Sequence, residues 1–503
     1  MTYARQFARH AALTVATAVV TGVLFYALRI VLYQYLTPPE YGLFYACFSL
    51  VMIIQTVTSF GFDPGLVPFI TEFREEHDDD AIKCLALGSL VPQFALALCA
   101  ATALAALAEP IAMALTGDAD GALLLRILSL HLFCVVLFKA GQQVLLGLQA
   151  IAWRNAADLA RAVVCLGSAI VLFRAGVGAK STAIAYTLAA ATEVMVQCLA
   201  LFWAYGNILH ARFTWRPGLV LSAFHTGKYL SIAFGGIIVF SSFDTLVITL
   251  VRRDLNDAAA YQVALPTVTI LYSLMVAAGL SLLPTVKTMW IRNERAQLAL
   301  GIEHLYEAAI AVMLPSGVVM ACYSDVIMST LFRRDILHAP DAFNILAAGG
   351  IAFFVAYLNL HVLAGINSPR AAAACVVAGL GIDLVCNPLL TYVYGIRGTA
   401  IAGVAGYGTT AGIGLYLLRR ELSIRLPLRT FGGSAVLSAV LALLCLWFRN
   451  SALFASSPIL AALVFCLISL PAVLVTLEVT RATRLRETLR MLWPKTGPRD
   501  PTP

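Results

Sequence analysis

Long apolar segments constrain this sequence more than any other feature. A helix needs about 20 apolar residues to cross a bilayer, and on that criterion the chain contains fourteen candidate spans. They predict an all-α polytopic membrane protein with about fourteen transmembrane helices. The predicted spans are 12–36, 41–70, 83–108, 121–147, 156–174, 181–205, 226–251, 257–285, 302–322, 342–366, 371–394, 398–418, 431–448 and 457–478.

The composition supports the same class and excludes others. Only 12% of the residues are charged and 60% are hydrophobic, with a mean hydropathy of +0.86. An ordinary soluble domain has about 25% charged and about 45–50% apolar residues. A soluble enzyme, a secreted disulfide scaffold and a disordered protein are therefore excluded. The net charge of +7 is not concentrated in a basic domain, so we expect no nucleic-acid partner.

The cysteines and the loops indicate no catalytic or metal chemistry. The eleven cysteines fall mostly in apolar runs, without a CxxC pair or a Cys/His cluster, so we predict neither disulfides nor a metal or cofactor. There is no Walker-type nucleotide motif, no Ser/His/Asp set and no loop long enough for a folded soluble domain. These observations predict a protein that works through its helix bundle and is not an enzyme.

The distribution of basic residues predicts the orientation. With the N-terminus in the cytoplasm, 23 of the 34 Lys and Arg residues fall on cytoplasmic segments and nine on outer segments. The positive-inside rule then predicts an even number of spans with both termini cytoplasmic. The acidic segment 72–80 is an exception of little weight, because acidic residues contribute little to topology. The first apolar run is too long for a signal peptide and should be retained as a span.

A weak internal repeat suggests how the spans are organised. Segments 40–68 and 257–284 both begin with an acidic turn, place an aromatic residue four positions later and close in Leu-x-Pro, at an offset of about 217. Chance similarity of two apolar hairpins is the alternative. A true repeat predicts two parallel six-helix lobes related by a pseudo-twofold axis. The predicted units are an N-terminal lobe (1–205), a linker (206–225), a C-terminal lobe (226–420), two extra helices (421–480) and a basic tail (481–503).

Several motifs together resemble one family of transporters. They are YQYLTPPEYGLF at 33–44, GINSPR at 365–370, NPLL at 387–390 and GIRGTAIA at 395–402. In this order they resemble bacterial polysaccharide-biosynthesis and O-antigen flippases of the multidrug/oligosaccharidyl-lipid/polysaccharide exporter superfamily. Small residues here allow close helix approach, and Gly/Asn pairs suit turns, so we interpret these positions as structural: Gly42, Gly365, Asn367, Asn387, Gly395 and Gly398.

The resemblance implies a function and a location. It implies a flippase of the inner membrane that moves a polyprenyl-diphosphate-linked oligosaccharide by alternating access, for cell-surface polysaccharide synthesis. It also implies membrane lipids, a polysaccharide polymerase and glycosyltransferases of the same pathway as partners. Two alternatives stay open: a cation-coupled multidrug antiporter of the same superfamily, and a non-transporting subunit of an export system.

Charged residues inside the spans are the main functional signal, since a charge in the bilayer normally faces a cavity or a partner. The resemblance implies that spans 1 and 7 line a central cavity, where we predict that Arg29 pairs with Asp244 until a lipid-linked diphosphate competes for the guanidinium. A static ion pair that only fixes packing is the alternative. Lys139 is predicted to hold substrate phosphate near the cytoplasmic entrance, or else to snorkel.

Three further acids are candidates for ion coupling or for pairing between the lobes. Asp63 precedes Pro64-Gly65, which fits either a kink at a cavity or a helix-end turn. Glu193 and Asp383 lie within predicted spans 6 and 11. For both, a proton or ion site and a purely structural contact remain open.

Overall fold

A computed structural model gives the structure of the chain for residues 3–59, 61–117, 121–280, 282–332, 338–425, 427–451, 457–459 and 465, with the side chains of 3–12, 209, 271–280 and 284 left out. This described part contains helices and no strands. The helices are α1 (Tyr3–Tyr35), α2 (Pro38–Thr58), α3 (Asp63–Glu75), α4 (Asp79–Ala106), α5 (Ala108–Thr116), α6 (Gly121–Gly147), α7 (Ile151–Arg174), α8 (Lys180–Ala204), α9 (Gly206–His210), α10 (Pro217–Arg252), α11 (Leu255–Leu280), α12 (Leu282–Ile291), α13 (Arg295–Cys322), α14 (Ser324–Leu331), α15 (Ala339–Gly365), α16 (Pro369–Tyr394), α17 (Ile396–Leu422) and α18 (Leu428–Arg449).

Twelve of the described helices are long and apolar enough to cross a membrane. They are α1, α2, α4, α6, α7, α8, α10, α13, α15, α16, α17 and α18. The predicted span 257–285 falls mainly on α11, and the predicted span 457–478 lies largely outside the described residues. The all-α polytopic membrane fold is confirmed.

The second predicted span, 41–70, is wrong as a single helix. It divides into α2 and α3, with Gly61 between them at a φ of +87°. Positive φ is accessible to glycine at little cost. Pro64 then occupies the first turn of α3, where its missing N–H is not needed. Asp63 is therefore the first residue of a new helix and does not lie at a kink within a continuous one.

The helix boundaries confirm the internal repeat. An offset of 217 residues carries the end of α1, Tyr35, onto the end of α10, Arg252, and the start of α2, Pro38, onto the start of α11, Leu255. Helices α3–α8 correspond in the same way to α12–α17, within two or three residues at each boundary. Helices α9 and α18 fall outside the repeat. We refer to α1–α8 as the N-terminal half and to α10–α17 as the C-terminal half.

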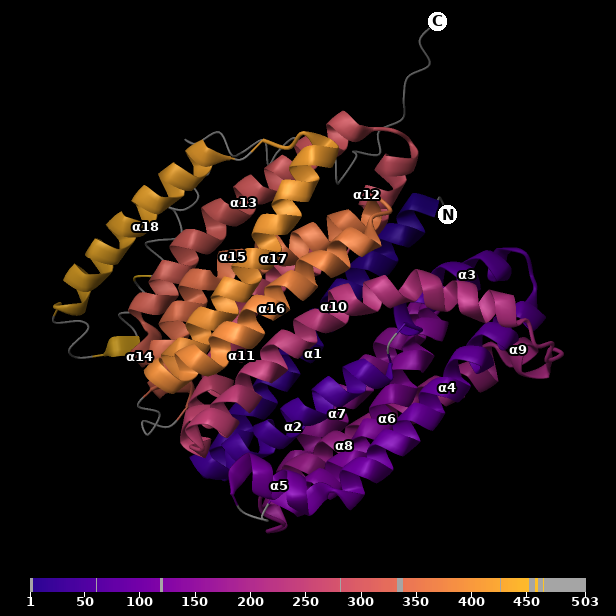
Figure 1. The fold of residues 1–503 in the computed structure, drawn as a ribbon, viewed down its shortest axis with the longest axis horizontal. Helices are drawn as coiled ribbons and strands as arrows, with labels where there is room; N and C mark the ends of the chain where they lie inside the picture. The colour runs from indigo at the N-terminus through magenta and orange to yellow at the C-terminus, as the bar shows by residue number, and fades with distance from the viewer. Residues whose placement is uncertain are drawn as a thin grey trace, which may run out of the picture.

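The two halves lie side by side. Figure 1 shows α2–α8 gathered on one side of the molecule and α13–α18 on the other, with α10 running between them. Helix α2 packs on both α10 and α11, and α3 packs on α10. The predicted linker is partly helical, because 206–225 includes α9 and the first turns of α10. Helix α18 packs along α13 on the outside of the C-terminal half (Figure 1).

Candidate functional site

A cavity of about 820 Å³ lies between the two halves. Its walls come from α1 and α2 on one side and from α10, α11, α15 and α17 on the other. Arg29 is the only charged side chain among the described lining residues. The other lining residues are mainly apolar or aromatic, with a few hydroxyl and amide groups.

Arg29 is held between the halves by uncharged groups. Its Nη1 atom donates hydrogen bonds to the main-chain oxygen of Gln262 at 3.0 Å and to its side-chain Oε1 at 3.1 Å. Its guanidinium carbon lies 4.5 Å from the ring centroid of Tyr45, a cation–π contact. Nearby on α1, the hydroxyl of Tyr26 is bonded to that of Thr267 on α11 at 2.9 Å. All of these partners of Arg29 are uncharged. The guanidinium therefore places a positive charge in the cavity, and no ion pair among the described residues neutralises it.

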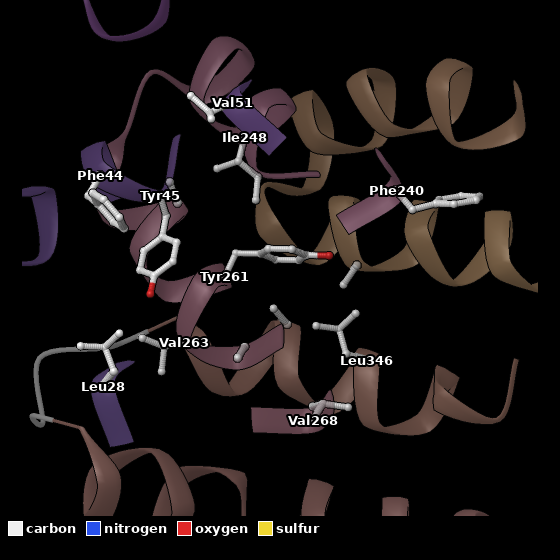
Figure 2. Close-up of a cluster of buried hydrophobic side chains, with 14 of the residues drawn as sticks. Leu28, Phe44, Tyr45, Val51, Phe240, Ile248, Tyr261, Val263, Val268 and Leu346 are labelled. Carbon is white, nitrogen blue, oxygen red and sulfur yellow. The ribbon is translucent and has the colours of Figure 1, made fainter. Parts of the chain in front are cut away.

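The predicted ion pair between Arg29 and Asp244 is not formed in this structure. The two carboxylate oxygens of Asp244 instead accept hydrogen bonds from Tyr261 at 2.5 Å and from Asn387 at 2.7 Å. Tyr261 and Gln262 are neighbours on α11, and consecutive helical residues point in different directions. Tyr261 therefore donates a hydrogen bond to Asp244 inside the C-terminal half, while Gln262 accepts hydrogen bonds from Arg29 in the cavity. Figure 2 shows the hydroxyl of Tyr261 pointing away from Tyr45.

Asp244 belongs to a second buried feature, which we call the acidic pair. Its partner is Asp383 on α16, and the side chains are 3% and 0% exposed, respectively. The Nδ2 atom of Asn387 donates to both, at 2.7 Å and 3.2 Å, and Asn387 is in turn bonded by Thr391 at 2.9 Å. No basic residue of the described part forms an ion pair with either acid. Asn387, predicted to be structural, is thus the group that links the two carboxyl groups.

Glu193 lies in a different environment, the charge network of the N-terminal half. Its Oε2 atom forms an ion pair with Nε of Arg161 at 2.7 Å, and Gln142 donates to its Oε1 at 2.6 Å. Gln142 also donates to Asp158 at 2.8 Å, and Asp158 lies 3.8 Å from Arg161. The guanidinium of Arg161 stacks over the ring of Phe25, which lines the cavity. The sequence interpretation missed Arg161, although its spacing of three residues from Asp158 was a signal for pairing.

Lys139 and Asp63 lie near this network. Lys139 is not among the residues that line this cavity, and its role in holding substrate phosphate near the cytoplasmic entrance stays a prediction. It interacts electrostatically with Asp63 on α3 and with Glu193, and it forms no contact ion pair within the described part of the chain. After the helix break before Asp63, α3 packs on α6, the helix that carries Lys139.

The motif glycines lie at close approaches and turns. A side chain at Gly42 would collide with the backbone of Leu255, where the two halves meet, and one at Gly398 would collide with the end of α16. A side chain at Gly365 would press on a side chain of α12. Gly395 and Asn367 adopt a φ of +60°, as turns before α17 and α16 require.

Comparison with known proteins places the chain in a family and a fold. The model of the family "Polysaccharide biosynthesis protein" matches residues 7–290. A curated relative from Methanocaldococcus jannaschii, an uncharacterised membrane protein, is 24% identical and the match covers 76% of this chain and 78% of the relative. A probable low-salt glycan biosynthesis flippase from Haloferax volcanii is 25% identical, over 57% of this chain and 59% of that protein.

Solved structures agree on the fold. The lipid II flippase MurJ in an inward closed conformation aligns with a TM-score of 0.67 at 13% identity, covering 93% of this chain and 99% of that one. An inward-facing multidrug resistance MATE transporter of the MOP superfamily also aligns at 0.67, with 14% identity, over 82% and 98%. The fold is thus that of MOP-superfamily transporters. Since the family model matches more than half of the sequence, the chain belongs to the polysaccharide biosynthesis protein family.

Proposed function

We propose that this protein is a flippase for a polyprenyl-diphosphate-linked oligosaccharide or a similar glycolipid. The observation that carries the proposal is the cavity between the halves, with Arg29 as its one charged lining residue in the described part of the chain. Guanidinium groups match phosphate oxygens with parallel hydrogen bonds. The family membership and the flippase relative from Haloferax volcanii support the same substrate class.

Arg29 is positioned to exchange its present contacts for substrate. Gln262 supplies neutral oxygen acceptors, so a diphosphate offers Arg29 a stronger, charge-assisted partner. A volume of about 820 Å³ suits a compact polar headgroup, while the lipid tail remains in the bilayer. Substrate binding would release the contact from Arg29 on α1 to Gln262 on α11 and so loosen one connection between the halves.

Alternating access then follows from the repeat. If one half rocks against the other, the contacts that must break are those that join them, including Arg29 with Gln262 and Tyr26 with Thr267. We propose that the N-terminal and C-terminal lobes predicted from the sequence are the moving units. We also propose a location in the cytoplasmic membrane with both termini inside, as the basic residues predict, and a transport role without catalysis.

The acidic pair is the proposed coupling site. Two buried carboxyl groups joined by Asn387, without a basic partner among the described residues, need protons or a bound cation to be stable in a low-dielectric interior. Gain or loss of that positive charge would change the packing of α10 against α16, which sits beside the interface with α2. An ion gradient could bias the cycle in this way.

Deleting the gene in its host tests the proposal most simply. The expected result is accumulation of a lipid-linked glycan on the cytoplasmic leaflet, restored to normal by the wild-type gene and restored less by an Arg29→Gln variant. Full restoration by the Arg29→Gln gene would contradict the proposed role of Arg29 in binding the substrate, and unchanged lipid-linked glycan in the deletion strain would contradict the flippase function.

A cation-coupled drug antiporter is the second candidate, because the cavity walls are mainly apolar and the MATE fold matches as well as MurJ. Unchanged lipid intermediates together with altered dye or drug efflux in the deletion strain would favour it. The cationic Arg29 in the cavity speaks against a cationic drug as substrate.

A further inference from the structure

Two cysteines meet at one end of the contact between α13 and α18. Cys322 is the last residue of α13, and Cys445 lies one turn before the end of α18. Cys445 belongs to a cluster of buried side chains that includes Tyr323 and Phe465, and Cys322 packs against the same cluster. Both are free thiols in the structure; Cys445 is buried and Cys322 is partly exposed. Two cysteine side chains packed in one cluster are compatible with the short Cβ separation that a disulfide requires.

The surrounding contacts hold the two helix ends in register. Arg449, one turn after Cys445, donates from Nη1 to the main-chain oxygen of Cys322 at 2.5 Å. It also forms a two-point pair with Asp325, at 3.1 Å and 2.6 Å. The ring of Phe465 packs on Tyr323 and on Phe448 close by. The two cysteines are therefore part of a built interface between the two helices.

We propose that Cys322 and Cys445 form a disulfide on the outer side of the membrane. The proposal rests on the proposed orientation, because termini in the cytoplasm place the ends of both α13 and α18 outside, where disulfides persist. It does not depend on which substrate is carried. The proposal departs from the sequence expectation of no disulfides. Cysteine counting could not indicate the pair, since neither residue belongs to a spacing motif and only the helix packing brings them together.

The oxidant for this disulfide would be a dithiol protein in its disulfide form, which reacts by thiol–disulfide exchange. The partly exposed Cys322 attacks the oxidant's disulfide as a thiolate and forms a mixed disulfide, releasing one thiol of the oxidant. The Cys445 thiolate then attacks the sulfur of Cys322 and releases the second. Two protons and two electrons leave the cysteine pair, and the oxidant becomes a dithiol. The bond would tie α18, which lies outside the repeat, to α13 of the C-terminal half.

Counting the reversibly oxidised cysteines of the full-length protein tests this directly. Cells expressing the chain are quenched in acid, free thiols are blocked with N-ethylmaleimide in SDS, and the sample is then reduced and labelled with a polyethylene-glycol maleimide. We expect two labels on the wild-type protein and none on Cys322→Ser or Cys445→Ser. The control Cys198→Ser, on the exposed face of α8, should still carry two.

A second measurement needs no variant. Mass spectrometry of unreduced wild-type digests should show the Cys322 and Cys445 peptides linked, and separate after reduction. An unlabelled wild-type protein from aerobic cells, or labelling that persists in both serine variants, would overturn the proposal. A bond that appears only after an added oxidant such as copper phenanthroline would also overturn it, since the pair would then not be oxidised in the cell. None of these outcomes depends on transport, so they are distinct from a failure of the proposed function.

Discussion

The two halves share their helix pattern but carry opposite buried chemistry. In the N-terminal half, Glu193 is matched by Arg161, with Gln142 bonded to the same carboxylate. In the C-terminal half, Asp244 and Asp383 share an amide and have no basic partner among the described residues. At the offset of 217, Glu193 corresponds to a threonine and Asp244 to an alanine. A common backbone thus supports a balanced charge network in one half and unbalanced acids in the other.

We propose that the balanced charges have a structural role and that the unbalanced acids have a role in transport. Removing one partner of a buried ion pair destabilises the fold, whereas replacing both partners by apolar residues of similar size is often neutral. Buried acids without a basic partner add little to the stability of the fold. In membrane spans such acids commonly bind a proton or an ion. We therefore expect substitutions in the N-terminal half to affect folding first, and those at the acidic pair to affect transport first.

Breaking the N-terminal pair should have the largest effect on stability. Arg161→Met leaves Glu193 buried without its partner and should lower the free energy of unfolding by about 2–3 kcal/mol, less than for a fully enclosed pair because Arg161 is 29% exposed. Thermal unfolding in detergent measures this. The double variant Arg161→Met/Glu193→Leu should recover most of the loss. Equal instability of the single and double variants would contradict a balanced pair.

Neutralising one member of the acidic pair should reduce transport and leave the stability of the fold unchanged or higher. Asp383→Asn removes a buried titratable carboxyl group that no basic residue of the described part balances, so the melting temperature should hold or rise. Ion-driven transport should fall by about tenfold, equivalent to 1.4 kcal/mol in the coupling step. Flux measured with and without an ion gradient separates coupling from substrate binding. Glu193→Gln is the matched control; if it loses coupling to the same extent without loss of stability, the halves do not differ as described.

The N-terminal ends of α4 and of its counterpart α13 also differ between the halves. Asp78 caps α4 by accepting a hydrogen bond from the amide of Ala81 at 2.9 Å. The corresponding helix α13 starts after Glu294, which makes no such bond. Asp78→Ala should therefore cost about 1 kcal/mol of stability, and Glu294→Ala close to none. Similar melting temperatures for the two variants would show that the cap contributes nothing.

The smallest effect concerns pH. The Ala81 amide and the guanidinium of Arg216, 2.9 Å away, hold the pKa of the Asp78 carboxyl below its ordinary value. A carboxyl with a lowered pKa in the folded state stabilises it above the unfolded pKa, and this contribution is lost as pH falls through the folded value. Wild type should thus lose a small advantage over Asp78→Asn below about pH 4, since exposed pairs are weak. Parallel melting curves from pH 6 to pH 3 would contradict it.

Much of the fold could be predicted because lipid demands long apolar helices, and helix length follows from bilayer thickness. The predicted span 121–147 coincides with α6, and the offset of 217 recurs in the helix boundaries. The break in 41–70 was underestimated, because apolar residues continue on both sides of Gly61. Short helices at the surface, such as α9, are too brief to leave a periodic signal.

The site was predicted less well because packing decides which side chains meet. Arg29 was identified as a cavity residue, but its partner depends on the rotation of α11, which directs Tyr261 and Gln262 to different sides. Lys139 was predicted to hold substrate phosphate or to snorkel, whereas in the structure it interacts electrostatically with Asp63 and Glu193. Asn387 looked like a packing residue until α10 placed Asp244 beside it. Apolar periodicity indicates the exposed face of a helix poorly when lipid and protein core are equally apolar.

Translocation by purified protein in liposomes tests the central claim most directly. Vesicles containing a fluorescent polyprenyl-diphosphate oligosaccharide would be assayed for substrate moved between leaflets, for wild type, Arg29→Lys and Arg29→Gln. The account predicts transport by wild type, reduced transport by Arg29→Lys, which keeps the charge but not the planar fork, and near loss with Arg29→Gln. Wild-type rates from a correctly folded Arg29→Gln protein, or no translocation by wild type with an imposed ion gradient, would contradict it.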